Sequence, residues 1–359
     1  MASPGGNGSS QAVRIHKFEW PGLQPDLRLE VFDSDEFHVH STIMKLHSAF
    51  FRRFLDSPDK TADPSMPVRR GAFKYNWITK VDEDGSWALV SDTSQLTVKD
   101  KGYKLMRDRS EEIAVFCKLL KAIYRRDYIV DSVADLERLT RMADYYLALP
   151  ALSFSLYMTL PKSHKFIAEL IKCAPTIIET ARKLRNTVLF RECLVYVMNP
   201  WDCPRYLDKK RGGKPLKDWN PALQKAFGAA TINFHQQIVR VHQQLLDLRV
   251  EGGFSEFETG VLAKLKEEHE YTGGDRFPLP VFLQKLSYLC SSECESIYTE
   301  KGYDVEGIYD LEETLEELLD NQLTLSPKVT AGCDSFEEYL LCIKIEDELL
   351  PWDREQVDW

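Results

Sequence analysis

Histidine and cysteine pairs are the residues of this sequence that could bind a metal ion. Cys290 and Cys294 are four residues apart, and His235 and His242 are seven apart, in stretches with helical periodicity. A structural zinc site needs four thiolate or imidazole ligands, and no second pair lies near the two cysteines. Two helical turns separate the histidines, which is too far for both to bind one ion. We therefore expect core cysteines, exposed or partly buried histidines, no metal site and no cofactor.

Sequence motifs of enzymes are absent. The glycine-rich patterns that bind phosphates, the Gly-x-Ser-x-Gly of hydrolases and the His-Glu-x-x-His of zinc proteases do not occur. His38 and His40 fall on one side of an expected strand, but the sequence places no nucleophile or acid beside them. The acidic run 82–84 lacks the spaced ligands of a calcium loop and is interpreted as a turn. The sequence therefore predicts no catalytic or cofactor-binding residues and a protein that is not an enzyme.

Length and composition fit a globular protein with two or three domains. The chain has 359 residues, of which 43% are hydrophobic and 28% charged. No apolar run approaches the roughly 18 residues of a membrane span, and the first ten residues lack the basic and apolar regions of a signal peptide. We expect reduced cysteines, no membrane partner and a cytoplasmic or nuclear location, or both.

The net charge of −10 is concentrated at the C-terminal end. Residues 310–359 contain 15 Asp and Glu against 3 Lys and Arg, a charge of −12, so residues 1–309 sum to +2. Phosphate contacts need clustered Lys and Arg, so we expect no direct nucleic-acid partner. The basic cluster in the chain is Lys209, Lys210, Arg211 and Lys214. It is interpreted either as a solvated linker or as a nuclear import signal.

The stretch from Asp26 to Leu55 has the most informative pattern of the chain. Leu27, Leu29 and Val31 alternate with polar residues, and Phe37 and Val39 do the same after a turn, which predicts a hairpin. From residue 41 the apolar residues recur at three-and-four spacing, which predicts two short helices split near residue 47.

This stretch resembles the start of a BTB/POZ domain. The family pattern opens on an Asp in the first strand and continues with Phe-x-x-His, a helix with an apolar pair, Ser-x-x-Phe and a later Ile-Tyr pair. The residues that match it, here called the signature residues, are Asp26, Phe37, His40, Ser48, Phe51, Ile123 and Tyr124. The resemblance covers about residues 26–160, and the aliphatic helix ending in Asn-Pro-Trp at 199–201 is similar to fungal BTB proteins of unassigned role.

The resemblance implies an α+β domain with a small sheet covered by helices. It also implies that His40 is structural and that the protein acts by homodimerisation and protein binding, as an adaptor or scaffold. An alternative is a substrate adaptor of a cullin-3 ubiquitin ligase, although no Glu lies between Leu55 and Phe73, where such members carry a motif. A second alternative is a transcriptional regulator without its own DNA-binding domain. Repressors of the family pair the strand Asp with a basic residue, which is Ser41 here.

Five segments are expected along the chain. They are a disordered N-terminus (1–12), a BTB/POZ domain with a β-hairpin insertion (13–160), post-BTB helices (161–200), a basic linker loop (201–220) and a helical C-terminal domain with an acidic end (221–359). The inserted hairpin combines 73–81 with 87–90, turns at Gly85 and is followed by a further strand at 96–98. Later helices are expected at 110–124, 131–149, 151–160, 166–173, 176–185, 187–198, 221–249, 254–269, 280–299, 311–319 and 336–349.

Overall fold

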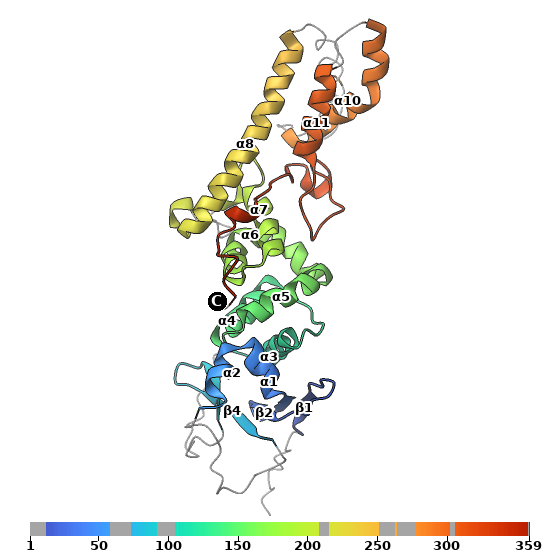
Figure 1. Ribbon diagram of the computed structural model, residues 1–359. Coiled ribbons are helices and arrows are strands. Elements are labelled where there is room, and N and C mark those ends of the chain that lie inside the picture. Colours follow the sequence, from blue (N-terminus) through green and yellow to red (C-terminus); the bar gives the residue numbers. More distant parts are fainter. Residues whose placement is uncertain are drawn as a thin grey trace, which may run out of the picture. The chain divides into compact units, whose positions relative to one another are not determined.

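The computed structural model divides into two compact units, and each is described by itself (Figure 1). The structure describes residues 12–57, 73–91, 105, 107–207, 215–250, 263, 278–301, 306–357 and 359. Unit 1 runs to Lys162 and includes the last residues of the chain, while unit 2 is Ser163–Gln356. The strand expected at 96–98 and the basic cluster at 209–214 lie outside the described residues. The disordered segment expected at 1–12 and the helix expected at 254–269 also lie outside them, except for residues 12 and 263.

Unit 1 is built on a five-stranded mixed sheet. Its strands are β1 (Arg14–Lys17), β2 (Leu27–Val31), β3 (Asp35–Val39), β4 (Tyr75–Val81) and β5 (Trp87–Ser91), in the order β1-β3-β2-β4-β5. β2 pairs with β3 and β4 with β5 in antiparallel fashion, so both predicted hairpins are confirmed. The first hairpin turns with positive φ at Phe32 and Asp33, and the second has positive φ at Gly85, as its turn requires.

Helices cover this sheet and join its strands. α1 (Ser41–His47) and α2 (Ala49–Phe54) break at Ser48, as the spacing predicts, and lead from the first hairpin toward β4, which pairs with β2 in parallel. α3 (Arg109–Ile123), α4 (Val133–Tyr145) and α5 (Leu149–Thr159) follow, with a 3₁₀ turn at Leu160–Lys162. α3 begins one residue earlier than expected, because the Asp108 side chain accepts hydrogen bonds from the first free N–H groups. Unit 1 is therefore a mixed α+β structure.

The segment before β2 forms a strand that is not among the elements expected from the sequence. Residues 14–17 pair in parallel with β3, the second strand of the hairpin. The Asp35 carboxylate explains this placement, because it accepts hydrogen bonds from Arg14 at 3.1 Å and from His16 at 2.7 Å. The alternation of only four residues was too short a signal to predict this strand.

Unit 2 contains the remaining helices. They are α6 (His164–Leu184), α7 (Thr187–Met198), α8 (Pro221–Val250), α10 (Leu279–Lys301) and α11 (Glu306–Leu319), with 3₁₀ turns at Arg205–Leu207, Leu216–Asp218, Asp334–Phe336 and Asp347–Leu349. The helices expected at 187–198, 221–249, 280–299 and 311–319 are confirmed within a few residues. The expected linker at 201–220 lies inside this unit. None of the described helices has an apolar stretch long enough to cross a membrane.

The prediction that Pro175 divides two helices is wrong, because α6 continues through it. Proline removes one backbone hydrogen bond and disturbs the preceding turn, at a cost of about 3 kcal/mol. The helix buries a continuous apolar face on both sides of the proline, which comprises Phe166, Leu170, Ala174, Ile177, Ile178, Ala181 and Leu184. Burying several such side chains offsets that cost, at roughly 1.5–3 kcal/mol for each large one.

The prediction of a helix at 336–349 is also wrong. Only 3₁₀ turns lie at its two ends, and between them five consecutive residues from Tyr339 to Ile343 are buried. A helix on a surface cannot bury five residues in a row, because they would point in all directions around its axis. The backbone of this segment bonds elsewhere instead: Leu340 N donates to the Asn199 side chain at 3.0 Å, and Gln322 N donates to Leu341 O at 3.2 Å.

Candidate functional site

His40 and Tyr124 join the first hairpin to the end of α3. The Tyr124 hydroxyl accepts a hydrogen bond from His40 N at 2.7 Å and lies 2.9 Å from His40 Nδ1. His40 Nε2 lies 3.3 Å from Leu23 O, so a neutral ring with its hydrogen on Nε2 satisfies all three contacts. Both side chains are buried, and burial raises the pKa of Tyr124. Neither side chain faces an open site, which fits a structural role.

Asp26 and Ser48 hold the starts of the two short helices. The Asp26 carboxylate accepts hydrogen bonds from both N and Oγ of Ser41, each at 2.6 Å. Ser48 Oγ accepts from Phe51 N at 3.2 Å and donates to Tyr146 O at 2.5 Å. Ser41 therefore engages both oxygens of the Asp26 carboxylate.

The other signature residues belong to the core. Phe37 packs edge-on against Phe116 of α3 with ring centroids 5.4 Å apart. Phe51 stacks on Tyr146 at 5.6 Å, and Ile123 is buried. The signature residues thus connect hairpin, helices and core, but they do not form an accessible site.

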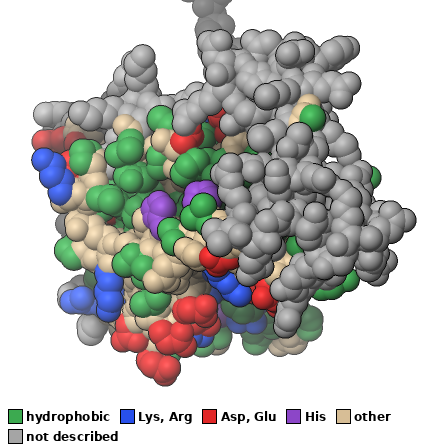
Figure 2. All heavy atoms as spheres, turned by 90° about the horizontal axis from the view of Figure 1, so that it is seen from above, with side chains coloured by type: hydrophobic (Ala, Val, Ile, Leu, Met, Phe, Trp, Pro, Cys, Tyr) green, Lys and Arg blue, Asp and Glu red, His purple; other side chains and the backbone are tan. Residues whose placement is uncertain are grey.

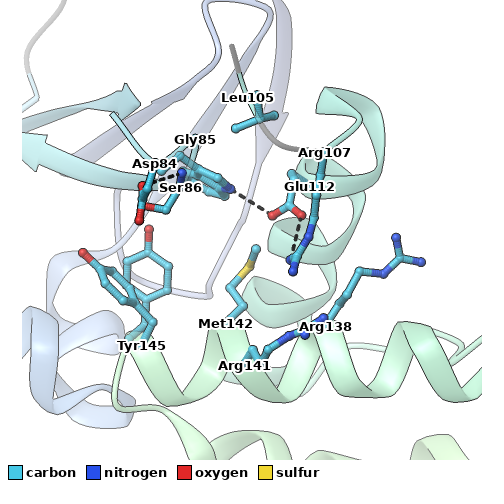
Figure 3. A pocket seen from close by; sticks show the side chains of 12 residues that line it. Asp84, Gly85, Ser86, Leu105, Arg107, Glu112, Arg138, Arg141, Met142 and Tyr145 are labelled. Carbon is cyan, nitrogen blue, oxygen red and sulfur yellow. Dashed lines mark hydrogen bonds and ion pairs between the residues drawn. The ribbon is translucent and has the colours of Figure 1, made fainter. Parts of the chain in front are cut away.

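A pocket in the described part of unit 1 lies elsewhere, between the β4–β5 turn, the start of α3 and one side of α4 (Figure 3). Its volume is about 330 Å³. The residues that line it are Asp84, Gly85, Ser86, Trp87, Leu105, Arg107, Glu112, Arg138, Arg141, Met142, Tyr145 and Tyr146. Figure 3 shows Asp84 and Ser86 on the opposite side of this space from Arg138. We name this space the hairpin pocket.

Hydrogen bonds fix one wall of the hairpin pocket. Glu112 is buried at the start of α3, where it accepts from Trp87 Nε1 at 2.9 Å and pairs with Arg107 at 3.4 Å. Asp84 accepts from N and Oγ of Ser86, and these bonds lower the pKa of its carboxyl group. One oxygen of Asp84 and both oxygens of Glu112 thus have partners within the protein.

The sequence reasoning missed the hairpin pocket. The inserted hairpin and its Gly85 turn were predicted, but the pocket depends on contacts between residues far apart in sequence, such as Trp87 with Glu112. The available signal was weak: Arg138, Arg141, Met142 and Tyr145 recur at three-and-four spacing on α4, away from its core face. Charged and aromatic residues at that spacing are typical of many solvated helices, so the pattern alone could not identify a site.

Three of the four histidines and cysteines in these pairs take the places expected for them. His235 and His242 are both exposed on α8, and Cys290 is buried. The side chain of Cys294 lies outside the described residues. Within the part of the chain that the structure describes, no three His, Cys, Asp or Glu side chains gather in a way that could hold a metal ion.

Comparison with known proteins does not identify a family or a function for this chain. The chain matches no protein-family model, no curated protein and no solved structure. The function must therefore be inferred from the residues and contacts of this chain.

Proposed function

We propose that this chain is a non-enzymatic protein-interaction adaptor or scaffold whose first unit is a BTB/POZ-type domain that self-associates. Two features support the proposal. A small sheet covered by helices is the architecture that the sequence resemblance implies, and the signature residues hold the hairpin, α1, α2 and α3 together.

The observation that carries the proposal is an exposed apolar surface on α1 and α5. We name it the α1/α5 patch and define it as Leu46, Phe154, Tyr157 and Met158. Leu46 and Met158 each expose 67% of their surface and Phe154 exposes 56%. The three residues on α5 recur at three-and-four spacing and so share one helix face. Large apolar side chains grouped on a surface are typical of protein-interaction sites.

Arg125 connects the two parts of this patch. Its guanidinium lies over the Phe154 ring, 4.6 Å from the ring centre. Its charge also reaches α1, because it lowers the pKa of His47, the neighbour of Leu46, in addition to the larger effect of burial. Arg125 thus lies close to both α5 and α1.

Unit 2 offers a separate surface on α8 for a protein partner. Ile232, Val239 and Leu246 are exposed at intervals of seven residues, with His235 and His242 between them. We name these five residues the α8 seam. A seven-residue apolar repeat is the pattern with which helices pack side by side. Figure 2, which labels no single residue, shows one face of the molecule on which hydrophobic side chains lie beside histidines, with acidic side chains near its lower edge.

Light scattering during size-exclusion chromatography tests the self-association. We expect the wild-type chain to be a dimer at high micromolar concentration. A variant with Phe154→Asp and Met158→Asp should be a monomer with an unchanged circular dichroism spectrum. The matched control places the same charges on α8, as Ile232→Asp with Val239→Asp, and should remain a dimer. A wild-type chain that stays monomeric would refute the self-association.

Affinity purification with the same variants tests the binding of a partner. A partner that contacts the α8 seam is lost from the Ile232→Asp/Val239→Asp variant and retained by the α5 variant. Repeated recovery of cullin-3 would favour the alternative function as a ubiquitin-ligase adaptor. The loop at 58–72, where that alternative expects its motif, lies outside the described residues. Loss of the same proteins from both variants, or from neither, would contradict the assignment of partner binding to α8.

A further inference from the structure

We propose that the hairpin pocket binds a peptide segment in which a carboxylate side chain stands next to an aromatic or large aliphatic side chain. The proposal deepens the proposed function, because it takes from that function the assumption that the ligand is a protein segment. It concerns a site that is separate from the α1/α5 patch and the α8 seam. Experiments can therefore refute peptide binding at the pocket and still confirm self-association, or the reverse.

Arg141 provides the site for an anion. It is exposed at the pocket and forms no ion pair or hydrogen bond with the described residues. The neighbouring Arg138 pairs with Glu111 through one terminal nitrogen, while its Nε is buried without a partner. Arg107 lies 3.4 Å from one oxygen of Glu112, while Trp87 donates to the other. A ligand carboxylate at this end would pair with Arg141, which the described residues leave unpaired.

Other residues that line the pocket suit an apolar side chain. Trp87, Tyr145 and Tyr146 contribute aromatic rings and Met142 contributes a flexible thioether. Tyr145 and Tyr146 lie at right angles with ring centres 5.0 Å apart, so they form two faces of a corner. A methionine beside aromatic rings adapts to side chains of different shapes. The space of about 330 Å³ is at the small end of ligand pockets, which fits one or two side chains of a peptide.

The balance of charge favours one carboxylate over a nucleotide. The lining residues include three arginines and two acids, a net charge of +1. A nucleoside diphosphate or triphosphate brings several negative charges and is usually held by backbone N–H groups of a glycine-rich loop. Gly85 is the one glycine among the lining residues, and Asp84 beside it would repel phosphate.

A random heptapeptide library displayed on phage and selected on the full-length chain tests this inference. We expect enriched peptides to share an Asp or Glu within two positions of Phe, Tyr, Trp, Leu, Ile or Met. A synthetic copy of the most enriched peptide should lose about tenfold in affinity toward Arg141→Gln, as expected for one charge-assisted hydrogen bond. Arg141→Glu should abolish binding.

Two controls keep the result specific. Arg141 is exposed and unpaired, so its replacement should leave the melting temperature unchanged, which separates lost binding from lost folding. Arg53→Gln, at an exposed arginine outside the pocket, should bind the peptide as the wild type does. Enriched peptides without a shared acid, peptides that bind Arg141→Glu as well as wild type, or competition by ATP in preference to the acidic peptides would overturn the proposal.

Discussion

Replacing Glu192 with glutamine should remove a pH dependence of stability that this buried carboxyl group imposes on unit 2. Glu192 lies on α7 and exposes 1% of its surface. Its Oε1 accepts a hydrogen bond from Leu325 N at 2.8 Å, while its Oε2 is buried without a partner. Burial raises the pKa of Glu192 to about 7, although the backbone hydrogen bonds from 324 and 325 act in the opposite direction.

The sign and size of the effect follow from linkage. The folded state holds the proton more tightly than the unfolded state, whose carboxyl has the ordinary pKa of 4.5. The stabilisation is therefore complete below pH 4.5 and is lost as the pH rises through about 7. A difference of about 2.5 pH units, at about 1.36 kcal/mol per unit, corresponds to about 3 kcal/mol of unfolding free energy.

Glutamine keeps an oxygen for the Leu325 N–H group and carries no charge at any pH in this range. Urea unfolding should be followed between about pH 4.5 and 8. Hydrogen exchange, measured on a peptide fragment that contains α7, then shows which unfolding transition belongs to unit 2. The difference between Glu192→Gln and wild type should grow with pH and reach up to about 3 kcal/mol in favour of the variant at about pH 8. Glu313→Gln, at an exposed residue of α11, is the matched control and should show no such trend. A difference that stays constant with pH would refute the reasoning.

Three other substitutions test the contacts that hold the fold. Tyr124→Phe leaves two groups of His40 without their partner and should lower the unfolding free energy by about 1–3 kcal/mol in urea unfolding, whereas Tyr309→Phe at an exposed residue should change it by less than about 0.5 kcal/mol. Ser48→Ala removes the cap of α2 and should cost about 1–2 kcal/mol in the same assay, so an unchanged midpoint would contradict the capping role. Asn199→Ala removes bonds to Val195 O, Leu340 O and Leu340 N and should expose residues 337–346 to limited proteolysis, and an unchanged cleavage pattern would argue against this anchoring.

Local sequence patterns were sufficient to predict a strand or helix where one face of that element is buried. The alternation of Leu27, Leu29 and Val31 predicted β2 because every second residue enters the core. Ser48 separated α1 from α2 because its hydroxyl caps the second helix, which is a contact over three residues. In both cases the decisive interactions lie within a few residues of one another, so the sequence alone contains them.

Local sequence patterns failed to predict the structure where contacts between residues far apart in the sequence determine it. The run from Tyr339 to Ile343 has the composition of a buried helix, but the amide of Asn199 binds its backbone from 141 residues away. Pro175 is a helix breaker by local chemistry, and the apolar face of α6 overrides it. The hairpin pocket also depends on contacts between distant residues, because Trp87 contacts Glu112 only when the sheet and α3 are packed together.

Hydroxyl-radical footprinting of Met158 tests the proposed self-association most directly, because it reports the exposure of a side chain that belongs to the α1/α5 patch. The chain would be oxidised at a dilute concentration, where it is monomeric, and at a high micromolar concentration. We predict that oxidation of Met158 and Phe154 falls in the concentrated sample, while oxidation of Tyr309 stays the same. Equal oxidation of Met158 in both samples, with a dimer present in the concentrated one, would contradict the role of this patch.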